Sequence, residues 1–148
     1  MKRKPLLRFV LPLFWSGVGT ALLVVLLLIL NVVNDFLESE VLGDILYFCW
    51  ANVPLLLAIS LLTGYAELMY KYRRTIAIIA PFLGSLAGVL ILRFVFGLVG
   101  IANLYLGIQS LDAVVGLVLN TMFLFFVVFL LIGYLKYIFN LMKGFLLR

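Results

Sequence analysis

The sequence predicts an all-α integral membrane protein with four transmembrane helices and both termini on the cytoplasmic side. Of its 148 residues, 67% are hydrophobic and 11% are charged, whereas soluble domains have about 45–50% apolar and about 25% charged residues. Several uncharged runs reach the roughly 20 residues that a helix needs to cross a bilayer. The basic residues gather in alternate connections between these runs. We therefore expect one four-helix transmembrane domain over 1–148.

The first span is predicted at about 9–33, within the uncharged run between Arg8 and Asp35. The preceding "MKRK" is typical of the start of a secretory signal peptide. The uncharged run is longer than the apolar region of such a signal, and no small-residue cleavage site follows it. We therefore expect this segment to stay in the mature protein as a transmembrane helix.

The second and fourth spans are predicted at about 45–68 and 113–136, because each covers an uncharged run that fits one crossing. Pro54 lies inside the second span. A proline deep in a helix removes one backbone hydrogen bond and usually kinks the helix. We therefore expect a kink there, which in transporters can also expose backbone groups to ions.

The third span is predicted at about 76–100, in a run that only Arg93 interrupts. This run continues to residue 111, so it is too long for one span and too short for two spans with a turn. We expect Gly97 and Gly100 to loosen the end of the helix. The apolar segment 101–111 would then lie at the interface or re-enter the membrane.

The charges orient the four spans. Five of the six acidic residues lie in the opposite connections, and cytoplasmic connections are enriched in Lys and Arg. Both termini are therefore predicted to be cytoplasmic, in the cytoplasmic (inner) membrane of a prokaryote. The basic residues on the predicted cytoplasmic side are Lys2, Arg3, Lys4, Arg8, Lys71, Arg73, Arg74, Lys136, Lys143 and Arg148, and the acidic residues opposite are Asp35, Glu38, Glu40, Asp44 and Asp112.

An ungapped match at an offset of 69 residues suggests an internal repeat. "PLFWSGVGTALL" from Pro12 aligns with "PFLGSLAGVLIL" from Pro81, and "LLTGY" aligns with "LLIGY". The fixed offset favours two tandem parallel helical hairpins, 5–74 and 75–143, over chance similarity of leucine-rich segments. In this alignment Arg93 corresponds to Val24.

The composition argues against several classes of function. The chain has no histidine and one cysteine, Cys49, so it lacks the usual ligands of zinc, copper and haem and the usual catalytic base of nucleophilic enzymes. The net charge of +5 comes from residues between apolar runs, not from a nucleic-acid-binding patch. We expect no cofactor, no metal, no nucleic acid and no enzymatic activity.

Small residues at helical spacing predict where helices pack. Such residues let transmembrane helices approach closely, and we expect the first and third spans to pack against each other or against a partner. The residues are Ala80, Gly84, Ser85 and Gly88 on the third span and Ser16 and Gly19 on the first. Glu67 and Lys71 are four residues apart, which predicts an ion pair at the cytoplasmic interface.

The remaining polar residues are expected in the outer half. Arg93 is about 28 Å along a helix from Arg74, which nearly spans the hydrocarbon thickness. It would hold a lipid headgroup, pair with a carboxylate of its own chain, contact another subunit or bind an anion. The candidate outer-leaflet residues are Arg93, Asn52, Asn120, Asp112, Glu38 and Glu40.

Together these features predict a non-catalytic scaffold, assembly or accessory subunit of a larger membrane complex, surrounded by the lipid bilayer and by other subunits or further copies of the chain. The alternative is a small ion or solute transporter or channel that acts as a homo-oligomer. The suggested repeat, Pro54 and the outer polar residues favour that alternative, whereas the lack of a charged pair at mid-membrane opposes it.

Overall fold

The computed structural model describes residues 5–72 and 76–146, and every regular element in these two segments is a helix. The helices are α1 (Pro5–Leu37), α2 (Glu40–Ala51), α3 (Val53–Tyr72), α4 (Ala80–Leu106), α5 (Gln109–Asn120) and α6 (Met122–Leu146). Part of the predicted orientation rests on basic residues outside the described segments, namely Lys2, Arg3, Lys4, Arg73, Arg74 and Arg148.

Four helical stretches are long and apolar enough to cross a membrane. Large apolar side chains are exposed along three of them in the isolated chain, whereas Val53–Lys71, which lies between two neighbouring arms, exposes Tyr70 and keeps its other large apolar side chains half-buried or buried. A helix that is apolar on every side is typical of a lipid environment or of the core of a large protein. The fold is therefore consistent with the predicted all-α membrane protein. The four stretches are Phe9–Leu37, Val53–Lys71, Ala80–Leu106 and Met122–Met142.

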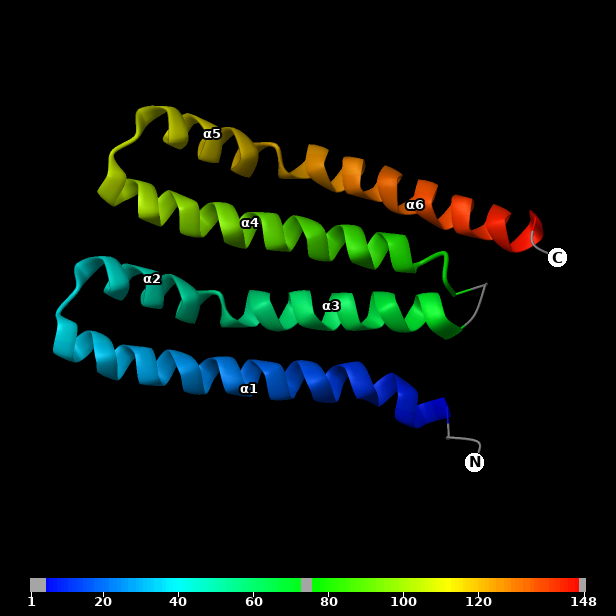
Figure 1. The fold of residues 1–148 in the computed structure, drawn as a ribbon, viewed down its shortest axis with the longest axis horizontal. Helices are drawn as coiled ribbons and strands as arrows, with labels where there is room; N and C mark the ends of the chain where they lie inside the picture. The colour runs from blue at the N-terminus through cyan, green and yellow to red at the C-terminus, as the bar shows by residue number, and fades with distance from the viewer. Residues whose placement is uncertain (1–4, 73–75, 147–148) are drawn as a thin grey trace.

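The four arms lie side by side in one layer, in the order α1, α2–α3, α4, α5–α6 (Figure 1). The main contacts follow this order, because α1 packs on α3, α3 on α4, and α4 on α6. The start of α1, the end of α3, the start of α4 and the end of α6 lie at one end of the layer, here called the terminal end (Figure 1). The α1–α2 and α4–α5 turns lie at the opposite, turn end. We call α1–α3 the first hairpin and α4–α6 the second hairpin.

The two turns reverse the chain through a left-handed residue. Glu38 has a φ of 48° between α1 and α2, and Gly107 has a φ of 65° between α4 and α5. Glycine adopts this conformation without a steric penalty, whereas glutamate does not. Ser39 then caps α2, because its hydroxyl accepts a hydrogen bond from the Leu42 amide at 3.4 Å.

The second arm of each hairpin is broken once. The first break lies at Asn52, between α2 and α3, where the Asn52 side-chain amide donates to the Phe48 carbonyl at 2.8 Å. Pro54 lacks an N–H group and so disturbs the helix there, as the sequence predicts. The second break lies at Thr121, whose hydroxyl donates to the Leu117 carbonyl at 2.7 Å. No proline accompanies this second break, so the sequence does not predict it.

The prediction for the end of the third span is wrong. α4 runs through Gly97 and Gly100 to Leu106, and α5 begins at Gln109. Residues 101–106 therefore continue α4, and the segment 101–111 is not a separate element after the helix. A single glycine inside an apolar helix is tolerated, and the helix at Gly97 is supported by the ring of Phe48, which packs directly on it.

The other bounds also differ, most of all at the end of the fourth arm, where α6 ends at Leu146 and the predicted span ends at about 136. The second and fourth arms begin at Glu40 and Gln109, earlier than the predicted starts at 45 and 113. Both arms extend because polar residues at a helix start are favourable when they lie near exposed amides, as Glu40 and Asp112 do in the first turns of α2 and α5.

Candidate functional site

Arg93 is the fourteenth of the 27 residues of α4, so it lies at the middle of the helix. At 1.5 Å per residue, each end of α4 is about 20 Å away. The expected position in the outer leaflet counts residues from Arg74, which lies outside the described residues, so it stays a prediction. Arg93 is exposed, and it forms no hydrogen bond or ion pair with any residue in 5–72 or 76–146.

The carboxylates nearest to Arg93 on the turn side are held by other groups. The Tyr105 hydroxyl donates to Asp44 Oδ2 at 2.7 Å, and the Asn103 amide donates to Asp112 Oδ1 at 2.6 Å. Asn103 and Tyr105 follow Arg93 on α4 by about 15–18 Å. Asp35, Glu38 and Glu40 lie still closer to the turn end or within it. These acids therefore do not neutralise Arg93.

The remaining carboxylate, Glu67, is paired on its own helix. Lys71 Nζ lies 3.1 Å from Glu67 Oε1, and the two side chains are 68% and 69% exposed. This is the i,i+4 pair that the sequence predicts, placed near the terminal end. Exposed pairs of this kind contribute only about 0.3–0.5 kcal/mol.

The two helix breaks lie close to the level of Arg93. On one side, the rings of Phe48 and Phe94 have centroids 5.5 Å apart, so the two residues lie at the same level. Asn52 comes four residues after Phe48, which places it about one helical turn closer to the terminal end. On the other side, Val115 packs against Gly100 and Phe129 against Gly88. Thr121 lies between Val115 and Phe129 in sequence, so it falls near the level of Arg93. The central part of the layer thus combines a charge on α4 with a broken helix on each side.

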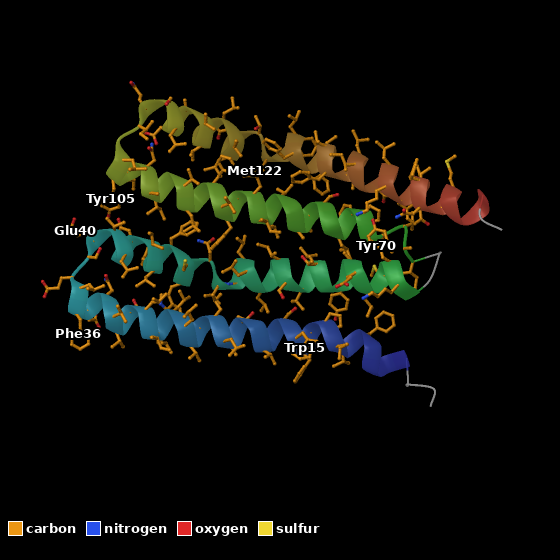
Figure 2. All side chains as sticks on the ribbon, viewed as in Figure 1. Trp15, Phe36, Glu40, Tyr70, Tyr105 and Met122 are labelled. Atoms are coloured by element: carbon orange, nitrogen blue, oxygen red, sulfur yellow. The ribbon has the colours of Figure 1, made fainter. Side chains whose placement is uncertain are left out.

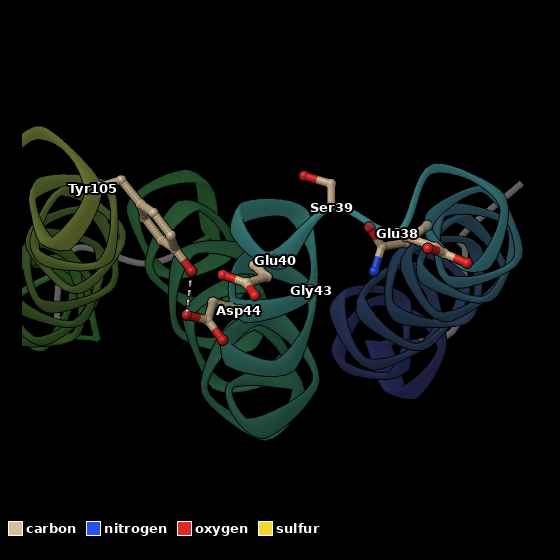
Figure 3. Close-up of a pocket in the computed structure, with 7 residues that line it drawn as sticks. Glu38, Ser39, Glu40, Gly43, Asp44 and Tyr105 are labelled. Atoms are coloured by element: carbon tan, nitrogen blue, oxygen red, sulfur yellow. Dashed lines mark hydrogen bonds between the residues drawn. The ribbon is translucent and has the colours of Figure 1, made fainter.

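An open hollow of about 430 Å³ lies at the turn end (Figure 3). Its lining residues come from the α1–α2 turn, the start of α2 and the end of α4: Asn34, Glu38, Ser39, Glu40, Gly43, Asp44 and Tyr105. Asn34 Oδ1 is buried and has no hydrogen-bond partner within the described residues. No group of three or more His, Cys, Asp or Glu residues in the described segments is arranged to hold a metal ion.

The candidate outer-leaflet residues do not form one cluster. Glu38 and Glu40 line the hollow at the turn end, where Figure 2 also labels Tyr105. Asp112 is bound to Asn103 in the second hairpin. Asn52 and Asn120 lie at the two helix breaks, and Asn120 is exposed. The structure therefore separates a polar turn end from a central region that contains Arg93.

The small residues predicted to pack helices behave in different ways. Ser16 is buried in the α1–α3 contact, where the Ser60 hydroxyl donates to Ser16 Oγ at 2.9 Å. Ser85 is also buried, but its hydroxyl donates to the Pro81 carbonyl of its own helix. Ala80 is fully buried, and Gly88 meets the ring of Phe129.

Two of the predicted packing glycines have open space beside them. Nothing lies within 4 Å of a Cβ placed on Gly19 or Gly84, and Gly84 borders a crevice of about 170 Å³ between α4 and α6. The expectation that the first and third spans pack against each other is wrong within this chain. α3 lies between α1 and α4, and each of them packs on it.

In each hairpin, a glycine–proline contact joins the two arms near the terminal end. A Cβ placed on Gly64 would lie 3.0 Å from Pro12 Cβ, and one placed on Gly133 would lie 3.1 Å from Pro81 Cβ. Both glycines and both prolines align at the offset of 69, but the contacts between them are not among the predictions from the sequence. That alignment was the available signal, because a proline that recurs with a glycine on the next arm suggests close approach of two backbones.

Comparison of the chain with profiles of known protein families, with curated proteins and with solved structures found no significant match.

Proposed function

We propose that this chain is a non-catalytic integral membrane protein that serves as a scaffold, assembly or accessory subunit of a larger membrane complex. The open single layer is the observation that carries the proposal. The chain exposes 10713 Å², whereas a compact protein of the same mass exposes about 7600 Å². Both broad faces of the layer and the outer sides of α1 and α6 are available to lipid and to the helices of other subunits.

The thickness of the layer supports a binding role. Four arms in a single layer enclose no space between them, so one copy cannot surround a path for a solute. The contacts available to its neighbours are apolar side chains and small residues such as Gly19 and Gly84. Close packing at small residues is a main source of helix association in lipid.

The proposal includes the predicted orientation, with both termini in the cytoplasm and the turn end outside, in the cytoplasmic membrane of a prokaryote. The distribution of charge supports it. The turn end carries Asp35, Glu38, Glu40, Asp44 and Asp112, whereas Lys71 and Lys136 lie toward the terminal end. Lys- and Arg-rich connections stay on the cytoplasmic side of bacterial membranes.

We also infer that the two hairpins are tandem parallel repeats. α2 and α5 are both 12 residues long, and they begin at Glu40 and Gln109, 69 positions apart. The same offset relates the breaks at Asn52 and Thr121, and the left-handed residues Glu38 and Gly107. The recurring glycine–proline contacts support the same relation.

Transport by a homo-oligomer is the second candidate function. The paired breaks favour it, because interrupted helices at corresponding positions of two repeats often mark the binding sites of transporters. In this chain the side chains of Asn52 and Thr121 close part of each break by bonding to Phe48 and Leu117 carbonyls. Further copies would have to complete any path.

The two functions are distinguished by isolating the tagged chain from its native membrane and by reconstituting the purified chain in liposomes. The subunit proposal predicts a complex of fixed stoichiometry with other membrane proteins, and no ion or solute flux through the chain alone. Purification as a homo-oligomer that conducts ions or solutes would replace it with the transport alternative.

A further inference from the structure

We propose that the face of α4 around Arg93 binds a transmembrane helix of another protein, and that this helix carries a carboxylate near the middle of its span. The inference rests on the proposed location of the chain in a membrane. It names the chemistry of the partner that the subunit role requires.

The position of Arg93 on α4 defines the face. The side of α4 toward the first hairpin is marked by Phe94 and Gly97, which contact Phe48. The side toward α6 is marked by Pro81 and Gly88, which contact Gly133 and Phe129. At about 100° per residue, Arg93 falls between these two sides and points to one broad face of the layer.

Apolar residues continue this face along the helix. Phe82, Leu86 and Leu104 are eleven residues before, seven before and eleven after Arg93, so they lie within about 20° of it around the helix. Phe82 and Leu104 are exposed. Leu86 is half-buried, the Phe82 ring also packs on Phe126 of α6, and Gly100, about 20° from Arg93, contacts Val115 of α5. We call this partly exposed apolar stripe with one central charge the Arg93 face.

A second copy of the chain does not complete this face. Its acids lie near Asn103 and Tyr105 or beyond them toward the turn end, except for Glu67, which is bound to Lys71. A parallel copy therefore offers no carboxylate at the level of Arg93, and an inverted copy offers none either. The complementary charge must come from a different molecule.

Lipid headgroups are also poorly placed to neutralise Arg93. Long basic side chains reach the headgroups when they lie near the end of a span. Arg93 lies about 20 Å from both ends of α4. Charged residues at such depth usually pair with another charge or with backbone carbonyls inside a protein assembly. A carboxylate is the best match, because its two oxygens accept the paired N–H groups of a guanidinium.

The test measures binding of synthetic leucine-rich helices of about 20 residues to the full chain in phosphatidylcholine vesicles by fluorescence energy transfer. Three peptides carry glutamate, glutamine or leucine at the centre. We expect the glutamate peptide to bind the wild-type chain about tenfold more tightly than the leucine peptide, with glutamine between them. Arg93→Leu should remove this preference, and Arg93→Lys should keep only part of it, because lysine retains the charge without the fork.

A relocated arginine serves as the matched control. Val95 is exposed on the opposite face of α4, and the double variant Arg93→Leu, Val95→Arg keeps the net charge and the depth. In this double variant the charge lies away from Phe82 and Leu86, so these residues should not contact the glutamate peptide. The proposal predicts that an added Leu86→Ala change weakens binding of the peptide to the wild-type chain and has no effect on its binding to the double variant. Circular dichroism checks that all variants are folded.

Three results would overturn the proposal. The first is equal binding of all three peptides by the wild type, and the second is a preference for the glutamate peptide that follows the arginine to either face of α4. The third is loss of the preference when phosphatidylglycerol is added to the vesicles. The last result would assign Arg93 to lipid phosphate. The outcomes are independent of the subunit role. Flux through the chain would contradict the subunit role without affecting the glutamate preference. A native complex formed by a chain that lacks the preference would support the subunit role and contradict the proposal for the Arg93 face.

Discussion

The two hairpins solve the same packing problem with different side chains. In the first, Ser60 donates to Ser16 across the α1–α3 contact at 2.9 Å. In the second, the position that corresponds to Ser60 is Phe129, and its ring presses on Gly88 while Ser85 bonds to its own helix. One hairpin therefore joins its arms by a polar contact, and the other joins them by an aromatic ring against a glycine. The shared backbone arrangement does not depend on one kind of contact.

The turns differ in the same way. Asn103 is 1% exposed, donates to Asp112 and Ile108, and accepts from the Ile108 amide. Asn34 occupies the corresponding position in the first hairpin, where Gly43 stands in place of Asp112. Its Oδ1 is left without a partner in the described chain. In the second turn both polar atoms of the asparagine side chain are hydrogen-bonded, whereas the first turn opens into the polar hollow at the turn end.

The largest difference in stability is expected at Gly97. It corresponds to Leu28 of the first hairpin, which is exposed. Because a Cβ on Gly97 would lie 2.5 Å from the Phe48 ring, Gly97→Leu should destabilise the fold by about 3 kcal/mol through overpacking. Unfolding by dodecyl sulfate in micelles measures this loss. Leu28→Gly is the control and should cost about 1 kcal/mol, mainly from helix propensity; equal losses would show that the α2–α4 contact is misplaced.

The two turn asparagines should respond unequally to the same change. Asn103→Leu leaves the Ile108 amide and Asp112 without their partners, and we expect a loss of about 2–3 kcal/mol. Asn34→Leu removes a group that already lacks one bond, so its effect should be close to zero. The same unfolding assay compares them, and a larger loss for Asn34 would contradict the assigned bonding.

The serine pair provides a smaller contrast. Ser16→Ala should cost about 0.6–1 kcal/mol, in the range measured for hydrogen bonds between transmembrane helices. Ser85→Ala removes only a bond within α4 and should change stability by less. Ser60→Ala combined with Ser16→Ala should cost no more than either change alone, and additive losses would show that the two hydroxyls do not interact.

The smallest expected effect is a gain. Gly43→Asp places in the first turn the carboxylate that the second turn has at Asp112, and Gly43 lies close to the Asn34 amide. Relative to Gly43→Ala, which shares its gain in helix propensity, Gly43→Asp should stabilise the chain by about 0.5 kcal/mol at moderate ionic strength. The gain should disappear in the Asn34→Leu background. If it persists there, the new carboxylate acts on something other than Asn34.

The sequence predicts the elements of the fold better than their arrangement. Uncharged runs locate the four apolar arms, because lipid requires about 20 apolar residues in each. The order of the arms in one layer cannot be predicted this way, since side chains that face lipid and side chains that face a helix are both apolar. The break at Thr121 carries no proline, so no residue pattern indicates it. The glycines at 97 and 100 suggest a helix end, whereas α4 continues through them with Phe48 and Val115 packed against it.

The residues of the candidate site are likewise easier to identify from the sequence than their arrangement. Glu67 and Lys71 are neighbours along one helix, so their spacing alone predicts the pair. Arg93 can be identified from the sequence as an isolated charge, but its place at the middle of α4 depends on where that helix begins and ends. The bonds of Asp44 to Tyr105 and of Asp112 to Asn103 join different segments, and no local pattern specifies them.

The open layer is tested most directly by the distance between its two outer arms in a lipid membrane. Leu22 on α1 and Leu124 on α6 are exposed and lie near the same level, so spin labels at these positions measure the width of the layer by double electron–electron resonance. Samples diluted with unlabelled chain exclude distances between copies. Three helix-to-helix steps of about 8–10 Å predict a separation of about 24–30 Å between the helix axes. A separation of about 10–14 Å, as in a closed four-helix bundle, would contradict the single-layer arrangement on which the proposed function and the Arg93 face depend.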